Sequence, residues 1–299
     1  MSSFLMETFS RFLAHDLHVS GGNAIKMWPP LLDSLYPCLR PVTDLAMKLS
    51  LLCQRAFANR LQCSHHLHHF VEYWCGAANL TKEMIKAGFE GAGFDIIHSH
   101  MHSCLDTCGL RLWMDMLMSI CEHGLCWLGP PCSSFVILCL AQSQRYGWNQ
   151  WWGDTTRTFV RTGNSHMQVA AMMFLVSCVI GIMVCLEQPD NSCLHKCLPM
   201  RSVLSFVKAH RVKTYLGAFA GPTQKPLQIW TNRVCFNQLS RDCPAREQLS
   251  GEQLVTRSED GRSFTGRKDL LEESGSYTPQ FGSSVAQTFA SEFLRLRHV

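Results

Sequence analysis

Residues 128–136 read L-G-P-P-C-S-S-F-V, and the two consecutive prolines limit how the chain can fold here. Proline fixes φ and has no N–H to give to a sheet ladder, so a strand cannot continue through Pro130 and Pro131. The apolar residues 125–128 therefore predict a buried strand that ends at Gly129. The stiff loop after it presents Cys132, and a thiolate is the strongest side-chain nucleophile near neutral pH. Cys132 is thus a candidate nucleophile, and the alternative is a buried structural cysteine on a turn.

Strand-like and helix-like segments alternate from residue 70 onward. The strand-like segments are 71–75, 91–97, 125–129 and 182–186, and the helical ones are 80–87, 110–122, 168–179 and 199–210. This alternation predicts an α/β fold, a doubly wound and mostly parallel sheet covered on both faces. We expect residues 1–69 to form a helical N-terminal extension, residues 145–165 a loop, and residues 239–276 a polar loop or small insert within a domain spanning 70–299.

Residues 169–186 form an uncharged run of 18 residues, the lower limit for a membrane span. Gly181 divides the run, and Glu187 follows it directly. A buried helix, a glycine turn and a buried strand explain the run as well, so we expect no membrane partner.

Composition limits the remaining classes. The chain has 299 residues, of which 46% are hydrophobic and 17% charged, so it can bury a core. The formal net charge is only +4, although from Arg201 onward 14 Lys/Arg against 9 Asp/Glu leave an excess of 14 − 9 = +5. A basic C-terminal third fits a polyanion partner, and scattered solvated charges are the alternative. Sixteen cysteines spread along a long chain without a secretory signal predict reduced thiols in the nucleus or cytoplasm.

A tight turn follows the strand at residues 71–75, where Gly76 begins G-A-A-N. Such a turn brings backbone N–H groups of the next helix near an anionic or polar ligand. Asp95 lies 19 residues beyond Gly76, where nucleotide-binding sheets hold a ribose hydroxyl. A loop with one glycine suits a ligand that has a ribose and no pyrophosphate. An ordinary strand–turn–helix is the alternative.

Glu187 ends the buried strand at residues 182–186 and is followed by Gln188 and Pro189. A buried carboxylate without a partner is costly, and α/β sheets place ligands at the carboxyl ends of strands. Glu187 could hydrogen-bond a protonated ring nitrogen, or it could simply face water.

Taken together, these segments resemble the DNA (cytosine-5) methyltransferase family. That family has an F-x-G-x-G loop, an acid after strand two, a G-P-P-C nucleophile loop, an E-N-V strand end and a late G-N-S-V segment. This chain has, in the same order, W-C-G-A-A at 74–78, Asp95, G-P-P-C at 129–132, E-Q-P at 187–189 and G-S-S-V at 282–285. The resemblance covers residues 70–293, and the Pro-Cys loop is its most specific part.

The resemblance implies a Rossmann-like methyltransferase sheet and a defined chemistry. Cys132 would attack carbon 6 of a cytosine in DNA, Glu187 would bond ring nitrogen 3, and carbon 5 would take the methyl group of S-adenosylmethionine. The target base would have to be flipped out of a duplex, at a cost of roughly a few kcal/mol. The implied cofactor contacts are Trp74, Gly76, Ala78, Asp95, Pro130 and Ser284, and the implied substrate contacts are Ser133 and Lys225.

The chain departs from the family pattern at Ala78, Gln188, Pro189 and Ser283. It has no Q-x-R-x-R segment, and residues 221–226 stand in its place. Lys225 in this stretch offers a point charge but not the planar, two-pronged donor geometry of an arginine. Two alternatives therefore stay open: a degenerate, non-catalytic nucleic-acid-binding relative, and a cytosine methyltransferase that acts on RNA.

No metal is expected, because the H-x₃-H pair of His65 and His69 has no Cys-x₂-Cys half nearby, and Cys193, His195 and Cys197 merely alternate. Trp148, Trp151 and Trp152 could stack on bases or could pack as a plug.

Overall fold

The computed structural model describes residues 68–249, 255–257, 264–266 and 275–298. The expected extension over 1–69 lies outside these residues except for its last two positions, which begin the first strand. The strands are β1 (His68–Tyr73), β2 (Gly91–Phe94), β3 (Ile120–Leu128), β4 (Met183–Pro189), β5 (His210–Tyr215), β6 (Pro226–Thr231), β7 (Val255–Arg257) and β8 (Phe264–Gly266). The helices are α4 (Asn79–Lys86), α5 (Thr107–Met118), α6 (Leu140–Ser143), α7 (Thr158–Val179), α8 (Leu198–Phe206) and α10 (Pro279–Arg297).

Six strands form one mixed sheet in the order β2-β1-β3-β4-β6-β5. β2, β1, β3 and β4 pair in parallel, whereas β6 is antiparallel to both β4 and β5. The expected α/β class is confirmed, and the fold is compatible with a Rossmann-like arrangement.

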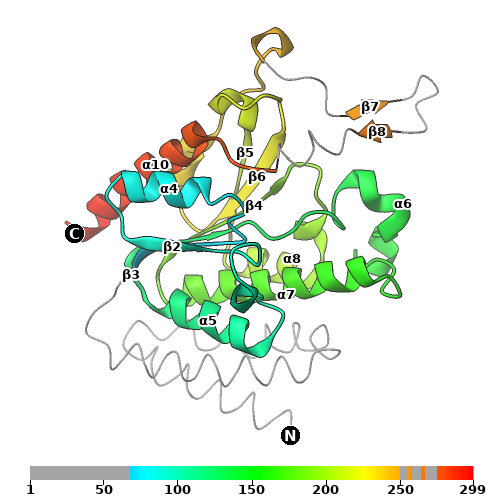
Figure 1. The fold of residues 1–299 in the computed structure, drawn as a ribbon, viewed down its shortest axis with the longest axis horizontal. Coiled ribbons are helices and arrows are strands. Elements are labelled where there is room, and N and C mark those ends of the chain that lie inside the picture. Colours follow the sequence, from blue (N-terminus) through cyan, green and yellow to red (C-terminus); the bar gives the residue numbers. More distant parts are fainter. Residues whose placement is uncertain (1–67, 250–254, 258–263, 267–274, 299) are drawn as a thin grey trace, which may run out of the picture.

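Helices cover both faces of this sheet (Figure 1). One hydrophobic cluster joins α5, α7 and α8 to one face, and a second joins α4 and α10 to the other. The strands feed both clusters by alternation: in β3, Cys126 and Leu128 belong to the first, whereas Leu125 and Trp127 belong to the second. A sheet buried on both faces explains why its strands are continuous apolar runs in the sequence.

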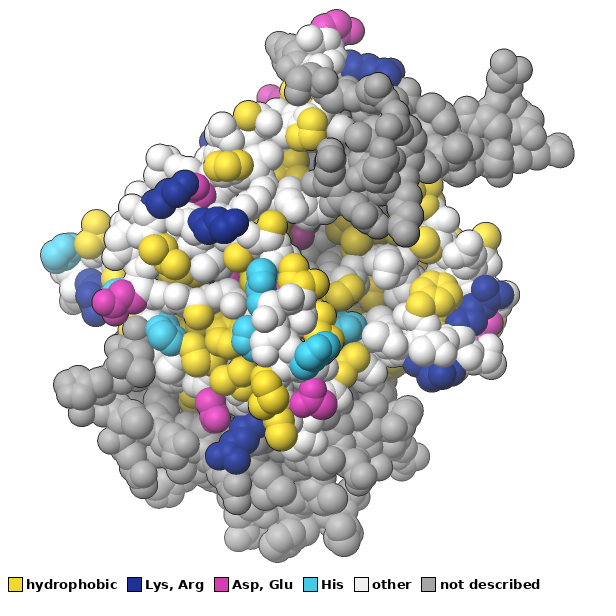
Figure 2. Space-filling view, viewed as in Figure 1, with side chains coloured by type: hydrophobic (Ala, Val, Ile, Leu, Met, Phe, Trp, Pro, Cys, Tyr) yellow, Lys and Arg dark blue, Asp and Glu magenta, His cyan; other side chains and the backbone are white. Residues whose placement is uncertain are grey.

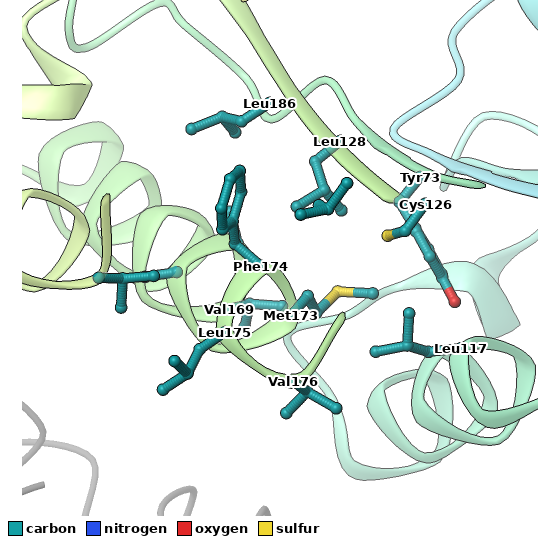
Figure 3. Close-up of a cluster of buried hydrophobic side chains, with 14 of the residues drawn as sticks. Tyr73, Leu117, Cys126, Leu128, Val169, Met173, Phe174, Leu175, Val176 and Leu186 are labelled. Carbon is teal, nitrogen blue, oxygen red and sulfur yellow. The ribbon is translucent and has the colours of Figure 1, made fainter. Parts of the chain in front are cut away.

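The uncharged run at 169–186 is a buried helix followed by a buried strand. Along α7, nearly every residue from Val169 to Ser177 is buried, because the helix lies between the sheet, α5 and α8. Figure 3 shows Phe174 of α7 directed toward Leu186 of β4, while the Met173 side chain extends toward Leu117 of α5. A helix that is apolar all round is typical of such a site. In the part of the chain that the structure describes, no helix combines the length and apolarity needed to cross a membrane.

Several expected element boundaries are wrong. The strand expected at 91–97 ends at Phe94, so Asp95 lies in the turn after it. The segment 110–122 was expected to be helical throughout, but Ile120 and Cys121 pack into opposite clusters, which only an extended chain allows, and they begin β3. The helix expected at 199–210 ends at Phe206, and His210 begins β5 by pairing with Thr231.

The expected loop at 145–165 is wrong in its second half. α7 begins at Thr158, ten residues before the expected start at Gln168, and its first turns bury Val160, Gly163 and Asn164. Within 239–276, the described parts are a short 3₁₀ turn at Arg246–Gln248 and the two-stranded antiparallel sheet of β7 and β8.

Candidate functional site

The residues that the sequence suggested for a site lie along one edge of the sheet, where β1 to β4 end. From β1 the chain passes to β2 on one side, and it later returns to β3 on the other side of β1. In open α/β sheets this arrangement leaves a ligand-binding crevice outside the carboxyl ends of the strands. Gly76 follows β1 and Gly129 follows β3, so both loops lie at this edge of the sheet. Asp95 follows β2, and Glu187 lies near the end of β4.

The loop after β1 has an unusual backbone. Trp74, Gly76 and Ala78 all have φ in the left-handed region, at 57°, 51° and 55°. Glycine adopts this conformation readily, whereas a residue with a Cβ rarely does. A Cβ built on Gly76 would meet no atom within 4 Å, so the space beside this glycine is open. Strained backbone of this kind gathers at ligand sites.

Asp95 fixes this loop from β2. Its Oδ2 accepts a hydrogen bond from the Gly76 N–H at 2.9 Å, and its Oδ1 accepts one from the Ile97 N–H at 3.1 Å. His98 Nε2 lies 2.8 Å from the carbonyl oxygen of Gly76. Each carboxylate oxygen keeps a lone-pair site, so Asp95 can still accept a bond from a ligand hydroxyl. The sequence spacing therefore identified two residues that are in direct contact.

Exposed apolar side chains adjoin Asp95. Ile96, Ile97 and Met101 are all exposed in the connection from β2 to α5. Figure 2 shows hydrophobic and histidine side chains gathering on this face of the molecule. The acid at the end of β2 therefore has a polar contact to the loop on one side and an apolar surface beside it.

Glu72 caps the helix that follows the Gly76 loop, a role that sequence analysis missed. Ala78 is the N-cap of α4 and has no side chain to accept a hydrogen bond. Glu72, fully buried on β1, supplies the acceptor: its Oε2 receives the N–H of Thr81 at 2.8 Å and the Thr81 hydroxyl at 2.6 Å. Its Oε1 has no hydrogen-bond partner among the described residues. Burial raises the pKa of Glu72 to about 7, against the lowering effect of the Thr81 hydrogen bonds. The one signal in the sequence was an acid inside the apolar strand.

Trp74 is fixed by the helices beneath the sheet. Its Nε1 donates to His166 Nδ1 at 3.2 Å, and its ring meets that of Trp113 edge to face, with centroids 4.7 Å apart. Burial lowers the pKa of His166 to about 4, so its ring is neutral near pH 7 and Nδ1 can accept. Cys104 Sγ lies 3.4 Å from the same nitrogen. Trp74 therefore forms a rigid part of the loop.

Gln188 ties β4 to the loop that carries Cys132. It is buried, and its Nε2 donates to the carbonyl oxygen of Pro130 at 2.6 Å. Its Oε1 accepts the Ser192 hydroxyl at 2.9 Å, so both ends of the amide are used. Gln188 thus orders the loop that carries Cys132.

Arg145 holds the same loop from the other side, and sequence analysis did not single it out. It is 0% exposed. Its Nε donates to the carbonyl oxygen of Ser134 at 2.7 Å, and its Nη2 donates to the Ser134 hydroxyl at 3.0 Å. Its Nη1 donates to the carbonyl oxygen of Trp151 at 2.8 Å and to Asn164 Oδ1 at 2.8 Å. The guanidinium carbon also lies 3.9 Å from the ring centroid of Phe135. One guanidinium fork therefore joins the nucleophile loop to α7.

Cys132, Glu187 and Lys225 influence one another electrostatically. Burial raises the pKa of the Cys132 thiol, the Glu187 carboxylate raises it further, and the Lys225 cation lowers it. Burial likewise raises the pKa of Glu187, which Lys225 and a hydrogen bond from Tyr277 oppose. These mutual effects indicate that the three side chains lie within electrostatic range of one another. The sequence had suggested all three separately.

Tyr277 contacts Glu187 directly, and nothing in the sequence pointed to this residue. Its hydroxyl donates to Glu187 Oε2 at 2.9 Å and accepts from Trp127 Nε1 at 3.1 Å. Its carbonyl oxygen accepts from Asn79 Nδ2 at 2.7 Å. A Cβ on Gly129 would come within 3.2 Å of the hydroxyl oxygen, so a glycine leaves the room that the tyrosine uses.

Other suggested residues lie near the site without a direct contact to it. Ser133 is exposed on the nucleophile loop, and Ser284 is partly buried in the first turns of α10, where its carbonyl oxygen accepts the Thr288 hydroxyl at 2.9 Å. Gly282 of the same helix packs closely against α4: a Cβ there would lie 3.0 Å from Glu83 Cγ. α10 thus packs against α4, the helix that follows the Gly76 loop.

The three tryptophans after the nucleophile loop divide into two kinds. Trp151 and Trp152 pack against the core, whereas Trp148 is 80% exposed and stacks on Tyr146 with ring centroids 6.4 Å apart. The interpretation as a packed plug therefore fits Trp151 and Trp152, whereas stacking on bases stays a prediction for Trp148.

Metal ligation finds no support in the described residues, where no group of three or more His, Cys, Asp or Glu side chains is arranged to hold an ion. His65 lies outside those residues. No protein-family model matches the chain, and no curated protein does either.

Proposed function

We propose that the chain transfers a methyl group from S-adenosylmethionine to carbon 5 of cytosine in DNA. The observation that carries the proposal is the 2.6 Å hydrogen bond from Gln188 to Pro130, which ties the strand end that bears Glu187 to the loop that bears Cys132, with the two side chains in electrostatic range of each other. A nucleophile and an acid on one small ring must act within a few ångströms of each other. The Pro-Cys loop and the end of β4 bring such a pair together at the edge where α/β sheets bind ligands.

The chain's own residues have distinct tasks in this reaction. Cys132 adds as a thiolate to carbon 6 of the base, while Glu187 in its protonated form donates to ring nitrogen 3. Carbon 5, now electron-rich, would take the methyl group of the sulfonium, which would become a neutral thioether. The carbon 5 proton would pass to water, and the sulfur of Cys132 would leave as a thiolate. Lys225 favours the thiolate, because it lowers the pKa of Cys132. Arg145 and Gln188 keep the loop rigid during addition and elimination.

The residues around the Gly76 loop fit the proposed cofactor. The open space at Gly76 admits a ligand against the backbone, and Asp95 can accept a ribose hydroxyl. Ile96 and Ile97, exposed beside Asp95, offer an apolar surface to a flat base. The cofactor would supply an electrophilic methyl group on a sulfonium, which the thiol and the acid cannot provide themselves.

A nucleic acid is the proposed partner because of the surface beside the thiol. The exposed Trp148 and its partner Tyr146 offer aromatic faces for bases. Nearby in the sequence, Arg157 and Arg161 are exposed, and Asp154 pairs with Arg157, so the surface balance of these three residues is 2 − 1 = +1. Positive charge near aromatic faces suits a phosphate backbone with unstacked bases.

The decisive experiment combines full-length protein, labelled S-adenosylmethionine and duplex DNA in which the cytosines are replaced by 5-fluorocytosine. We expect a covalent adduct that maps to Cys132, since fluorine at carbon 5 blocks elimination. Cys132→Ser should form no adduct, and Cys243→Ser, which removes an exposed thiol, should behave as wild type. An adduct that persists in Cys132→Ser would refute the assigned nucleophile.

A non-catalytic nucleic-acid-binding relative is the second candidate, favoured by the raised pKa of Cys132 and by Ala78 in a left-handed conformation. Calorimetric titration with S-adenosylmethionine discriminates the two: saturable heat supports the enzyme, and its absence supports the relative. Competition between RNA and DNA for adduct formation decides the substrate.

A further inference from the structure

Two consecutive hydrogen bonds connect the buried Trp127 through Tyr277 to Glu187. Trp127 Nε1 lies 3.1 Å from the Tyr277 hydroxyl oxygen, which lies 2.9 Å from Glu187 Oε2. Trp127 is 1% exposed and Glu187 is 8% exposed, so water competes little for these contacts. The Tyr277 ring also packs against Trp127 edge to face and against Phe281 of α10. The tyrosine is thus held in place independently of Glu187.

The direction of each bond in this chain follows from chemistry. An indole N–H can only donate, so the Tyr277 oxygen accepts from Trp127. The phenol then has one hydrogen left, and the partner within reach is Glu187 Oε2. Oε2 therefore accepts the phenol hydrogen. A proton on this carboxyl group is favoured on the other oxygen, Oε1, because a proton on Oε2 would compete with the phenol hydrogen for the same contact.

We propose that Tyr277 is a positioning residue that keeps the acidic proton of Glu187 on Oε1, directed at the substrate. The inference rests on the proposed function and adds the chemical class that the site selects. A donor fixed on Oε1 fits a ring nitrogen with a bare lone pair, such as nitrogen 3 of cytosine. It opposes a ring nitrogen that carries hydrogen, as in uracil or thymine, because two donors would then meet. In the forward step the proton moves from Oε1 to the ring nitrogen as the Cys132 sulfur bonds carbon 6, and it returns when the sulfur leaves.

Other charged groups face Glu187 and set its titration together with Tyr277. Lys225 precedes β6 and favours the carboxylate, and Cys132 adds negative charge only when it is a thiolate. The negative charge of Glu72 on β1 contributes to the raised pKa of the Tyr277 hydroxyl. Tyr277 itself stabilises the carboxylate by its hydrogen bond, so its loss should raise the pKa of Glu187.

Infrared difference spectroscopy of the full chain, titrated with acid and base, tests the position of the proton without substrate. The carbonyl stretch that is present in wild type and absent in Glu187→Gln belongs to Glu187. In Tyr277→Phe we expect this band at higher frequency and its titration midpoint about one pH unit higher, since one hydrogen bond to a charged group is lost. Tyr146→Phe, which removes an exposed hydroxyl, is the matched control. An unchanged band and midpoint in Tyr277→Phe would overturn the inference.

Adduct formation with oligonucleotides that contain 5-fluorocytosine or 5-fluorouracil gives the second measurement. We expect wild type to prefer the cytosine analogue, and Tyr277→Phe to lose about tenfold of that preference. If Tyr277→Phe does not fold, Asn79→Ala keeps the hydroxyl but frees the tyrosine backbone, and it should change both measurements in the same direction. No adduct in wild type, with the infrared shift present, overturns the proposed function alone. An adduct with unchanged preference and unchanged infrared midpoint overturns the inference alone.

Discussion

The side-chain amide of Gln188 donates to the carbonyl oxygen of Pro130 at 2.6 Å. This bond joins the end of β4, which carries Glu187, to the loop that carries Cys132. Both residues are buried. This contact limits how far Cys132 lies from Glu187, because Cys132 follows Pro130 by two positions and Glu187 precedes Gln188 by one.

Loss of the Gln188 amide should loosen the nucleophile loop. Gln188→Ala leaves the Pro130 carbonyl and the Ser192 hydroxyl without this partner, so we expect a lower free energy of unfolding by about 2 kcal/mol. Urea denaturation measures it. Gln287→Ala, an exposed site on α10, is the control and should change stability by less than about 0.5 kcal/mol. Equal stabilities of the two variants would show that the contact is not structural.

Replacing the buried Arg145 should greatly lower the free energy of unfolding. Arg145→Met leaves buried acceptors at Ser134, Trp151 and Asn164 unpaired, and we expect a loss of about 3 kcal/mol or more. Arg145→Lys should also destabilise, because an ammonium cannot reproduce the planar fork. The comparison is Arg111→Met, whose side chain is exposed and pairs only with Asp115. A wild-type denaturation midpoint for Arg145→Met would contradict the assigned role.

Glu72 should make stability fall as the pH rises. Its pKa in the folded protein is about 7, above the ordinary 4.5, so the folded state binds the proton more tightly than the unfolded chain. Between these two values the free energy of unfolding decreases with pH, by at most about 3 kcal/mol for this group. Glu72→Gln keeps an acceptor for Thr81 and cannot ionise. Urea denaturation near pH 5 and near pH 8 should show this variant gaining on wild type at the higher pH. A stability difference that does not change with pH would sink the prediction, and Glu122→Gln, at an exposed site, gives the baseline.

The reactivity of Cys132 should respond to its two charged neighbours in opposite directions. Lys225→Ala removes a cation that lowers the pKa of the thiol, so alkylation by iodoacetamide at about pH 8 should slow. Glu187→Gln removes a charge that raises this pKa, so alkylation should become faster. Mass spectrometry of the Cys132 peptide separates this thiol from the others. Lys86→Ala, exposed on α4, is the control. Changes of the same sign in both variants would exclude the electrostatic explanation.

Trp148 should contribute to binding and not to folding. The side chain is 80% exposed, so Trp148→Ala should leave the denaturation midpoint unchanged. Stacking on a base contributes about 1–3 kcal/mol, so affinity for a single-stranded oligonucleotide should fall at least about fivefold, as fluorescence anisotropy can measure. Trp152→Ala should lower the denaturation midpoint and leave the affinity of the folded protein unchanged, because that ring packs against the core. Unchanged affinity in Trp148→Ala would remove this residue from the proposed interface.

Local patterns in the sequence determined the class of fold and the edge of the sheet at which most candidate residues lie. Apolar runs ended by Gly76 and by Gly129 with its two prolines fixed where β1 and β3 stop, since glycine turns and proline loops act within a few residues. Parallel strands then bring their ends to one edge, which is why Asp95, Cys132 and Glu187 could be grouped without coordinates. The strand at Ile120 could not be foreseen, because its apolar residues also fit the preceding helix until opposite faces of a sheet are available to bury them.

Only the tertiary structure decided which side chains hold these groups in place. Arg145, Tyr277 and Glu72 act on partners from other elements, and their spacing in the chain carries no trace of those contacts. Whether a buried charge or hydroxyl is costly or useful depends on the acceptor that another segment brings to it. Short-range backbone preferences are written in the residues themselves, whereas the satisfaction of buried polar groups is settled when distant segments pack.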